Sequence, residues 1–136
     1  MIGKWSSIVV LTALAAVLLN ASSCARSQEL VSITIQPASV TFLSPFTDLQ
    51  FQLVAYGNYI HPPETKPITD KVTWTSSAPL LSTVSATGVV AVSGNGSCGV
   101  NLVTATYYTS GNQNGNVVVG TATVTVNNQA IPTCPQ

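Results

Sequence analysis

Charge is the scarcest property of this sequence. Four of its 136 residues are Lys or Arg and four are Asp or Glu, so charged residues make up 6% of the chain and the formal net charge is +0. The usual charged fraction is about 25%. Proteins that bind nucleic acids or anionic bilayers electrostatically present clusters of basic residues. The sequence therefore predicts no nucleic-acid partner and no charge-driven binding to a membrane.

Residues that carry catalysis or bind metals are also few. His61 is the only histidine; it lies beside Tyr59 in a Pro-rich stretch, and its nearest acid is Glu64. A catalytic base needs a partner within hydrogen-bond reach, and the sequence has no Gly-x-Ser-x-Gly element. The acidic residues at positions 29, 48, 64 and 70 are scattered, whereas calcium takes six to eight oxygen ligands. We expect a protein with no enzymatic activity, no cofactor and no metal site.

Apolar residues are plentiful, and they argue against disorder. Hydrophobic residues make up 46% of the chain, and its many Val and Thr residues suit β-strands better than a solvated coil. The chain has room for one domain of about 100 residues, which is enough to bury an independent core. The composition therefore predicts a single folded domain.

The first residues have the pattern of an export signal. Lys4 is the only charge before a 12-residue apolar run, Ile8–Leu19, and a short polar stretch leads from there to Cys24. A membrane-spanning helix needs about 20 apolar residues, so this run is short for a span and typical of a signal peptide. We predict that residues 1–23 are a bacterial signal peptide and that the protein is exported.

Two cleavage sites fit this leader. The stretch Ala21–Cys24, Ala-Ser-Ser-Cys, resembles a bacterial lipoprotein box, which implies that Cys24 is lipidated and becomes the mature N-terminus. The alternative is ordinary cleavage after Ala25, with Ser23 and Ala25 as the small pair. We favour lipidation, which would place the protein at the outer membrane or cell surface, in contact with the membrane only through its lipid anchor. Ordinary cleavage would leave it periplasmic or secreted.

The three cysteines, Cys24, Cys98 and Cys134, are an odd number. Lipidation would consume Cys24 and cleavage after Ala25 would remove it, so both interpretations leave two cysteines in an oxidising compartment. Their separation of 36 residues fits no zinc pattern. We predict a disulfide between Cys98 and Cys134. Two free thiols, or a bond between two chains, are the alternatives.

From Leu30 onward, short runs rich in Val, Thr and Ile alternate with turn residues, and no helical periodicity is present. The expected strands are Val31–Gln36, Val40–Leu43, Asp48–Tyr56, Lys71–Ser76, the stretch from Val84 to Val92, Gly99–Tyr108 and Gly120–Val126. About seven strands with turns every 8 to 12 residues predict an all-β fold, a single immunoglobulin-like antiparallel β-sandwich. We assign it residues 30–127, after a tether over residues 24–29 and before a C-terminal tail over residues 128–136.

Alternation within the strands predicts which side chains share a face. The sets expected on one face are Leu49, Phe51, Leu53 and Ala55; Val72 and Trp74; Val103, Ala105 and Tyr107; and Ala122, Val124 and Val126. Thr residues alternate with the last three sets, as in an antiparallel sheet with one wet face. We expect Trp74 to anchor the core, the alternative being an exposed platform for sugar stacking.

The last two strands are expected to form a hairpin across Ser110–Asn116. If it turns near the middle of this loop, facing residues have numbers that sum to about 226, and Cys98 lies opposite roughly Asn128. The six further residues to Cys134 reach at most about 20 Å, which allows the tail to fold back to Cys98.

Five stretches of the sequence carry a resemblance to a known family. They are Val31–Val40, Leu49–Ala55, Asp70–Ser77 with its Trp-Thr-Ser-Ser motif, Val84–Val90 and Gly120–Val126. In these stretches the chain resembles the bacterial immunoglobulin-like domain, group 2. The resemblance implies an extracellular β-sandwich of the kind found in invasin- and intimin-type adhesins and as a spacer module in surface enzymes, with cell adhesion as one expected role.

These observations predict an interaction or structural module of the cell envelope whose partner is an envelope protein or a glycan. The alternative function is a carbohydrate-binding module that uses loop tyrosines. Tyr56, Tyr59, Tyr107 and Tyr108 are the candidates for a contact surface. Tyr59 and Tyr108 are the pair that we expect to hold a ligand.

Overall fold

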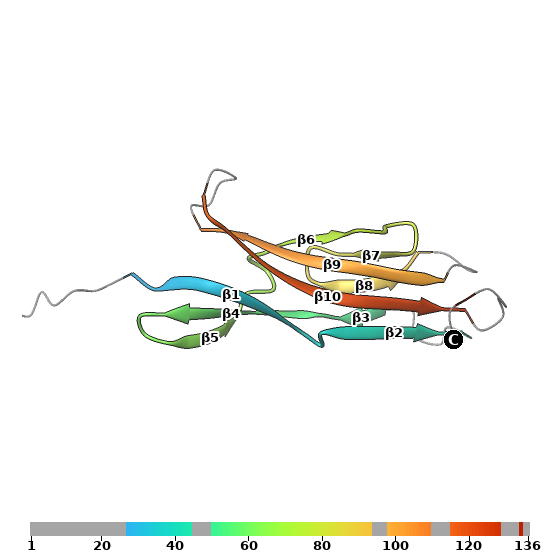
Figure 1. Ribbon diagram of the computed structural model, residues 1–136, viewed down its shortest axis with the longest axis horizontal. Coiled ribbons are helices and arrows are strands. Elements are labelled where there is room, and N and C mark those ends of the chain that lie inside the picture. The colour runs from blue at the N-terminus through green and yellow to red at the C-terminus, as the bar shows by residue number, and fades with distance from the viewer. Residues whose placement is uncertain (1–26, 45–49, 94–97, 110–114, 129–133, 135–136) are drawn as a thin grey trace, which may run out of the picture.

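The structure is a computed structural model and describes residues 27–44, 50–93, 98–109, 115–128 and Cys134 (Figure 1). The predicted signal peptide, Cys24, Leu49 and most of the tail lie outside these ranges. The strand segments are β1 (Glu29–Gln36), β2 (Ser39–Leu43), β3 (Gln50–Gln52), β4 (Val54–Ile60), β5 (Glu64–Pro67), β6 (Thr73–Ser76), β7 (Ser82–Val84), β8 (Val89–Val92), β9 (Gly99–Tyr108) and β10 (Val117–Asn127).

The strands form two layers that pack face to face (Figure 1). One layer is a four-stranded sheet in the order β2-β10-β9-β6. The other contains the sheets β1-β4-β5 and β3-β8-β7, which join because β3 and β4 are one strand interrupted at Leu53. The predicted all-β sandwich is confirmed. The described residues form ten segments instead of about seven, because that strand is interrupted and the short β5 and β7 are added.

β1 and β2 are the two halves of the first long strand, and each half belongs to a different layer. β1 pairs antiparallel with β4, whereas β2 pairs parallel with β10. Pro37 stands between the two halves after a cis peptide bond. Proline cannot donate to a strand ladder, so the pairing with β4 ends there. The described strand pairs are therefore antiparallel, as expected, except for the parallel pair of β2 and β10.

A β-bulge changes which side chains of β1 are buried. Leu30 pairs with Tyr59 and Ser32 pairs with Asn58, so Val31 is the extra residue. Simple alternation would have placed Val31 on the face of Ile33 and Ile35. Because the bulge shifts the register, Leu30 is buried with the two isoleucines and Val31 is exposed.

The Pro-rich stretch after Tyr56, in which no strand was expected, forms part of a hairpin. β4 continues to Ile60, a turn follows, and β5 returns alongside β4. The prolines are compatible with this hairpin because Pro62 and Pro63 lie in the turn and Pro67 ends β5, an edge strand.

The core lies between the two layers and confirms most of the predicted faces. Its buried apolar residues are Leu30, Ile33, Ile35, Val40, Phe42, Leu53, Ala55, Ile68, Val72, Trp74, Val90, Val103, Ala105, Ala122, Val124 and Val126. Trp74 is 8% exposed, and its Nε1 donates a hydrogen bond of 2.9 Å to the backbone oxygen of Thr69. It is therefore a core anchor and not an exposed platform. Phe51 pairs with the buried Val90 but is 44% exposed, because it lies at the open edge of β3.

Glycine permits the closest approach between the layers. A Cβ at Gly120 would lie 2.7 Å from both the backbone oxygen and Cγ2 of Ile33, so β10 can cross β1 only with no side chain there. Gly88 has a φ of 80° in the turn before β8, a conformation that favours glycine.

The hairpin of β9 and β10 has nearly the predicted register. Val117 faces Tyr108 and Val126 faces Gly99, so facing residues have numbers that sum to 225. Cys98 and Cys134 form a disulfide, with their Cα atoms 5.6 Å apart. This prediction is confirmed. The bridge lies at the end of the sandwich opposite to the start of β1 (Figure 1).

A buried amide joins three strands at the disulfide end, and the sequence analysis missed it. Asn101 of β9 is 0% exposed. Its Oδ1 accepts hydrogen bonds of 3.0 Å from the Ser77 hydroxyl and from the Ala78 backbone N–H. Its Nδ2 donates to the Ser76 hydroxyl and to the hydroxyl and backbone oxygen of Ser82. The two serines of the Trp-Thr-Ser-Ser motif therefore serve to satisfy a polar group inside the core.

Candidate functional site

The site with the most varied chemistry lies at the end of the sandwich where β1 begins. Tyr59 pairs with Leu30 on one side and with Glu64 on the other, and directly paired residues share a face. Tyr107 follows the buried Ala105 by two residues, so it points between the layers from β9. Both tyrosines line a hollow of about 200 Å³. We call this hollow, lined by Ser27, Gln28, Glu29, Leu30, Tyr59, Tyr107 and Thr109, the tyrosine mouth.

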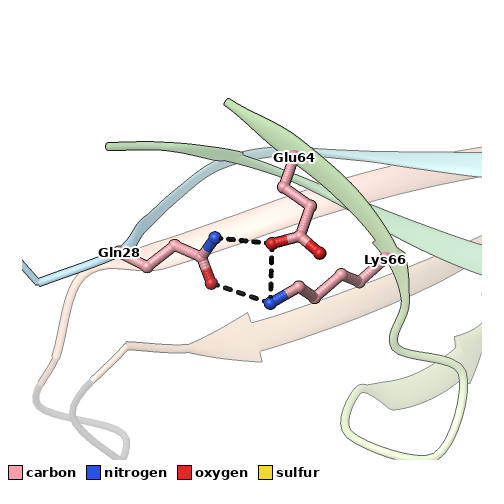
Figure 2. Close-up of polar contacts among 3 residues, drawn as sticks. All are labelled: Gln28, Glu64 and Lys66. Atoms are coloured by element: carbon pink, nitrogen blue, oxygen red, sulfur yellow. Dashed lines mark hydrogen bonds and ion pairs between the residues drawn. The ribbon is translucent and has the colours of Figure 1, made fainter. Parts of the chain in front are cut away.

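Three polar side chains lie at the tyrosine mouth and contact one another (Figure 2). Lys66 Nζ is 2.9 Å from Glu64 Oε2 and donates a hydrogen bond of 3.0 Å to Gln28 Oε1. Gln28 Nε2 donates a hydrogen bond of 2.9 Å to Glu64 Oε2. The residue before β1 is thereby joined to two residues of β5, which holds the first described residues against the sandwich.

The electrostatics of the tyrosine mouth follow from these contacts. Burial raises the pKa of Tyr59, and the neighbouring Tyr107 raises it further. Hydrogen bonds from Lys66 and then Gln28 lower the pKa of Glu64. Lys66 Nζ also lies 5.7 Å from the centre of the Tyr59 ring, within the range of a cation–π contact. The mouth therefore presents the Tyr59 phenol beside the ion pair of Glu64 and Lys66, and the Glu29 carboxylate also lines it.

The structure separates the two tyrosines that were expected to hold a ligand together. Tyr108 lines a second hollow of about 390 Å³, with Lys71, Thr73 and Thr106. Tyr107 lines both hollows, so it is Tyr107 and not Tyr108 that accompanies Tyr59. Alternation along β9 already indicated this, because Tyr107 shares the face of two buried residues. Tyr56 lies away from both hollows, where it pairs with Thr34 and Pro67.

His61 is exposed in the turn between β4 and β5, with a φ of 61°. Glu64, the acid nearest to it in the sequence, is engaged by Lys66 and Gln28. Within the described ranges, no group of three or more His, Cys, Asp and Glu side chains is placed to hold a metal ion. Among the same residues, no helix is long and apolar enough to cross a bilayer.

A third hollow, of about 500 Å³, lies between β2 and β3. It forms because the pairing of β1 with β4 ends at Pro37, after which β2 pairs with β10 in the other layer. Leu43 and Phe51, both exposed, and the buried Phe42 provide its apolar lining.

The tyrosine mouth combines two aromatic rings with the Gln28 amide and the Glu29 carboxylate, and the Glu64–Lys66 ion pair lies beside it. Tyrosine rings offer stacking surfaces, and the polar groups can donate and accept hydrogen bonds. This arrangement offers stacking surfaces and hydrogen-bonding groups to a polar ligand. Sequence reasoning had singled out Tyr59 and Glu64 but not Gln28 or Lys66, since only the pairing of β4 with β5 and the path of residues 27–28 bring them together.

No protein-family model matches this chain, and no curated protein sequence matches it.

Proposed function

We propose that this protein is an exported, non-enzymatic module of the bacterial cell envelope, an immunoglobulin-like domain of the group 2 type that is held by a lipid on Cys24. The observation that carries the proposal is the disulfide between Cys98 and Cys134. Disulfides persist in oxidising compartments outside the cytosol, in agreement with the leader. The scarcity of charge and of catalytic residue types supports a role in interaction rather than in catalysis.

A lipid on Cys24 would place the two ends of the sandwich at different distances from the membrane. The described chain begins at Ser27 beside the tyrosine mouth, and the disulfide lies at the opposite end (Figure 1). Cys24 lies three positions before Ser27, a distance of at most about 11 Å along an extended chain. A lipidated Cys24 would therefore hold the tyrosine mouth close to the bilayer and direct the disulfide end away from it.

Metabolic labelling with a fatty-acid probe tests the anchor. We expect the natural chain to be labelled and Cys24→Ala to lose the label completely. Ser27→Ala, a change just after the tether that keeps the lipid acceptor, serves as the matched control and should remain labelled. Unlabelled natural protein whose mature N-terminus is Arg26 would refute the anchor and establish ordinary cleavage.

The tyrosine mouth favours a second function, the binding of a carbohydrate. The Tyr59 and Tyr107 rings share one hollow with Gln28, and the Glu64 carboxylate and Lys66 ammonium groups lie beside it. Sugars present apolar ring faces and hydroxyl groups, which such rings and polar groups can bind. In this function the module would attach to a glycan of the envelope, and the lipid anchor would not be required.

Calorimetric titration with soluble peptidoglycan fragments and other bacterial glycans tests this second function. We expect Gln28→Ala and Tyr59→Ala each to weaken binding at least tenfold. Tyr56→Ala is the control, since it removes a tyrosine outside both hollows. An effect of Tyr108→Ala would show that the ligand extends into the second hollow. Equal losses from Tyr56→Ala and Tyr59→Ala would refute binding at the mouth.

A further inference from the structure

The strands of the four-stranded sheet present an outer face on which no strand residue is charged, and Lys71, which lines the second hollow, borders this face next to Thr73. None of the residues of β2, β6, β9 and β10 is charged, although these strands have 5, 4, 10 and 11 residues. We call the outward-facing positions of these four strands the neutral face. Its middle consists of threonines in register, with Thr104 paired to Thr75 on one side and to Thr121 on the other.

The neutral face also carries most of the exposed apolar side chains. Among the described residues, eight large hydrophobic side chains are exposed, and five of them lie here. They are Leu43, Val100, Leu102, Val117 and Val119, with exposures from 44% to 64%. The first three lie toward the disulfide end and the last two toward the tyrosine mouth, so apolar groups flank the threonines on both sides. A concentration of exposed apolar groups on one face marks an interaction surface.

The outer face of the other layer differs in its hydrogen bonding. There Asn58 donates to the hydroxyls of Ser32 and Thr34 and accepts from Thr65, so the polar groups satisfy one another. The hydroxyls of Thr104 and Thr121, by contrast, make no hydrogen bond to another side chain that the structure describes. Their capacity to donate and accept is left for solvent or a partner.

We propose that the neutral face binds a second copy of this chain. The strands of this face carry no charge and the chain has a net charge of +0, so two copies can meet with little like-charge repulsion, whereas a strongly charged partner would find only Lys71 at the border of the face. A hydroxyl is both donor and acceptor, so a row of threonines can pair with a copy of itself. That property suits a two-fold interface, in which the same surface is used on both subunits.

The area is sufficient for a weak, specific dimer. With strands about 4.8 Å apart and a rise of about 3.3 Å per residue, the four strands cover roughly 500 Å² per copy. The pair would bury about 1,000 Å² or somewhat more, the low end of specific interfaces. We therefore expect a dimer whose Kd is in the micromolar range. The inference does not depend on the anchor or on glycan binding.

Analytical ultracentrifugation of the full chain carrying Cys24→Ala tests the proposal, since that change prevents an acyl chain from holding two copies in one micelle. We expect a monomer–dimer equilibrium that changes little between about 50 mM and 500 mM salt, because none of the strand residues of this face is charged. Thr121→Lys, in the middle of the neutral face, should weaken it at least tenfold. Thr83→Lys, the same change at an exposed position of β7 in the other layer, should leave it unchanged.

A photo-crosslinking residue at position 119 provides a second measurement, in cells that export the natural chain. We expect a covalent homodimer in which the crosslinked peptides come from β9 or β10, and no homodimer from the same probe at position 83. Native Trp74 fluorescence in each variant shows that a loss of association is not a loss of folding. A purely monomeric chain at about 1 mM, or equal weakening by the two lysine substitutions, would overturn the proposal.

Discussion

Asn101→Ala would remove the side chain that joins β6, β7 and β9 inside the core. The Ala78 N–H would lose its acceptor, and the Ser82 hydroxyl would lose the amide that donates to it. The Ser82 backbone oxygen keeps a partner, because the Ser76 hydroxyl also donates to it. A buried donor without a partner costs about 1 to 3 kcal/mol, and each further hydrogen bond lost costs about 1 kcal/mol. We therefore expect the free energy of unfolding to fall by about 2 to 4 kcal/mol.

Asn58→Ala is the matched control for this prediction. Asn58 makes three side-chain hydrogen bonds, but they lie on an exposed face, where water can replace them. We expect it to cost less than about 1 kcal/mol. Urea unfolding followed by the fluorescence of Trp74 measures both variants. If Asn101→Ala cost no more than Asn58→Ala, the reasoning that burial makes this network stabilising would be refuted.

Four further predictions follow from the fold. Reduction of the disulfide should lower stability by roughly 3 to 4 kcal/mol and lower the melting temperature by more than about 10 °C; an unchanged melting temperature would contradict this. Trp74→Ala should cost about 3 to 5 kcal/mol, and native Trp74 emission should be blue-shifted relative to the unfolded chain. Gly120→Ala should cost about 1 to 3 kcal/mol, because the new Cβ would overlap the backbone of Ile33, and chemical denaturation can measure the loss. The lowered pKa of Glu64 means that its contact with Lys66 stabilises the fold above the unfolded pKa of about 4.3 and is lost as the pH falls; the small stability difference between the natural chain and Glu64→Gln should therefore vanish in acid.

Local pattern was sufficient to predict the parts of the fold that depend on alternation. Trp74, Val103 and Val124 are buried as period two requires, because a strand that is half covered sorts its side chains by face. The hairpin register was predicted to within one residue, because a short loop between two long strands leaves few ways to pair them. Cysteine parity and that register together led to the Cys98–Cys134 bridge.

The tyrosine mouth was only partly predictable. Tyr59 was singled out, and alternation placed Tyr107 on the inner face. Their meeting, however, depends on a bulge after Leu30 and on a β5 strand that its prolines concealed. Gln28 reaches Lys66 and Glu64 across 38 and 36 residues of chain, and no local pattern reports such contacts.

The sequence by itself determined the class of fold, the core face of most strands and the disulfide. These follow from composition, from period two and from parity, which are properties of short segments. Only the tertiary structure decided that the first strand divides between the layers at Pro37, that Asn101 is buried as a partner for three serines, and that the uncharged strands lie side by side as one face. Those outcomes depend on which distant segments pair. That pairing is set by the packing of the whole chain and by the need to satisfy each buried polar group.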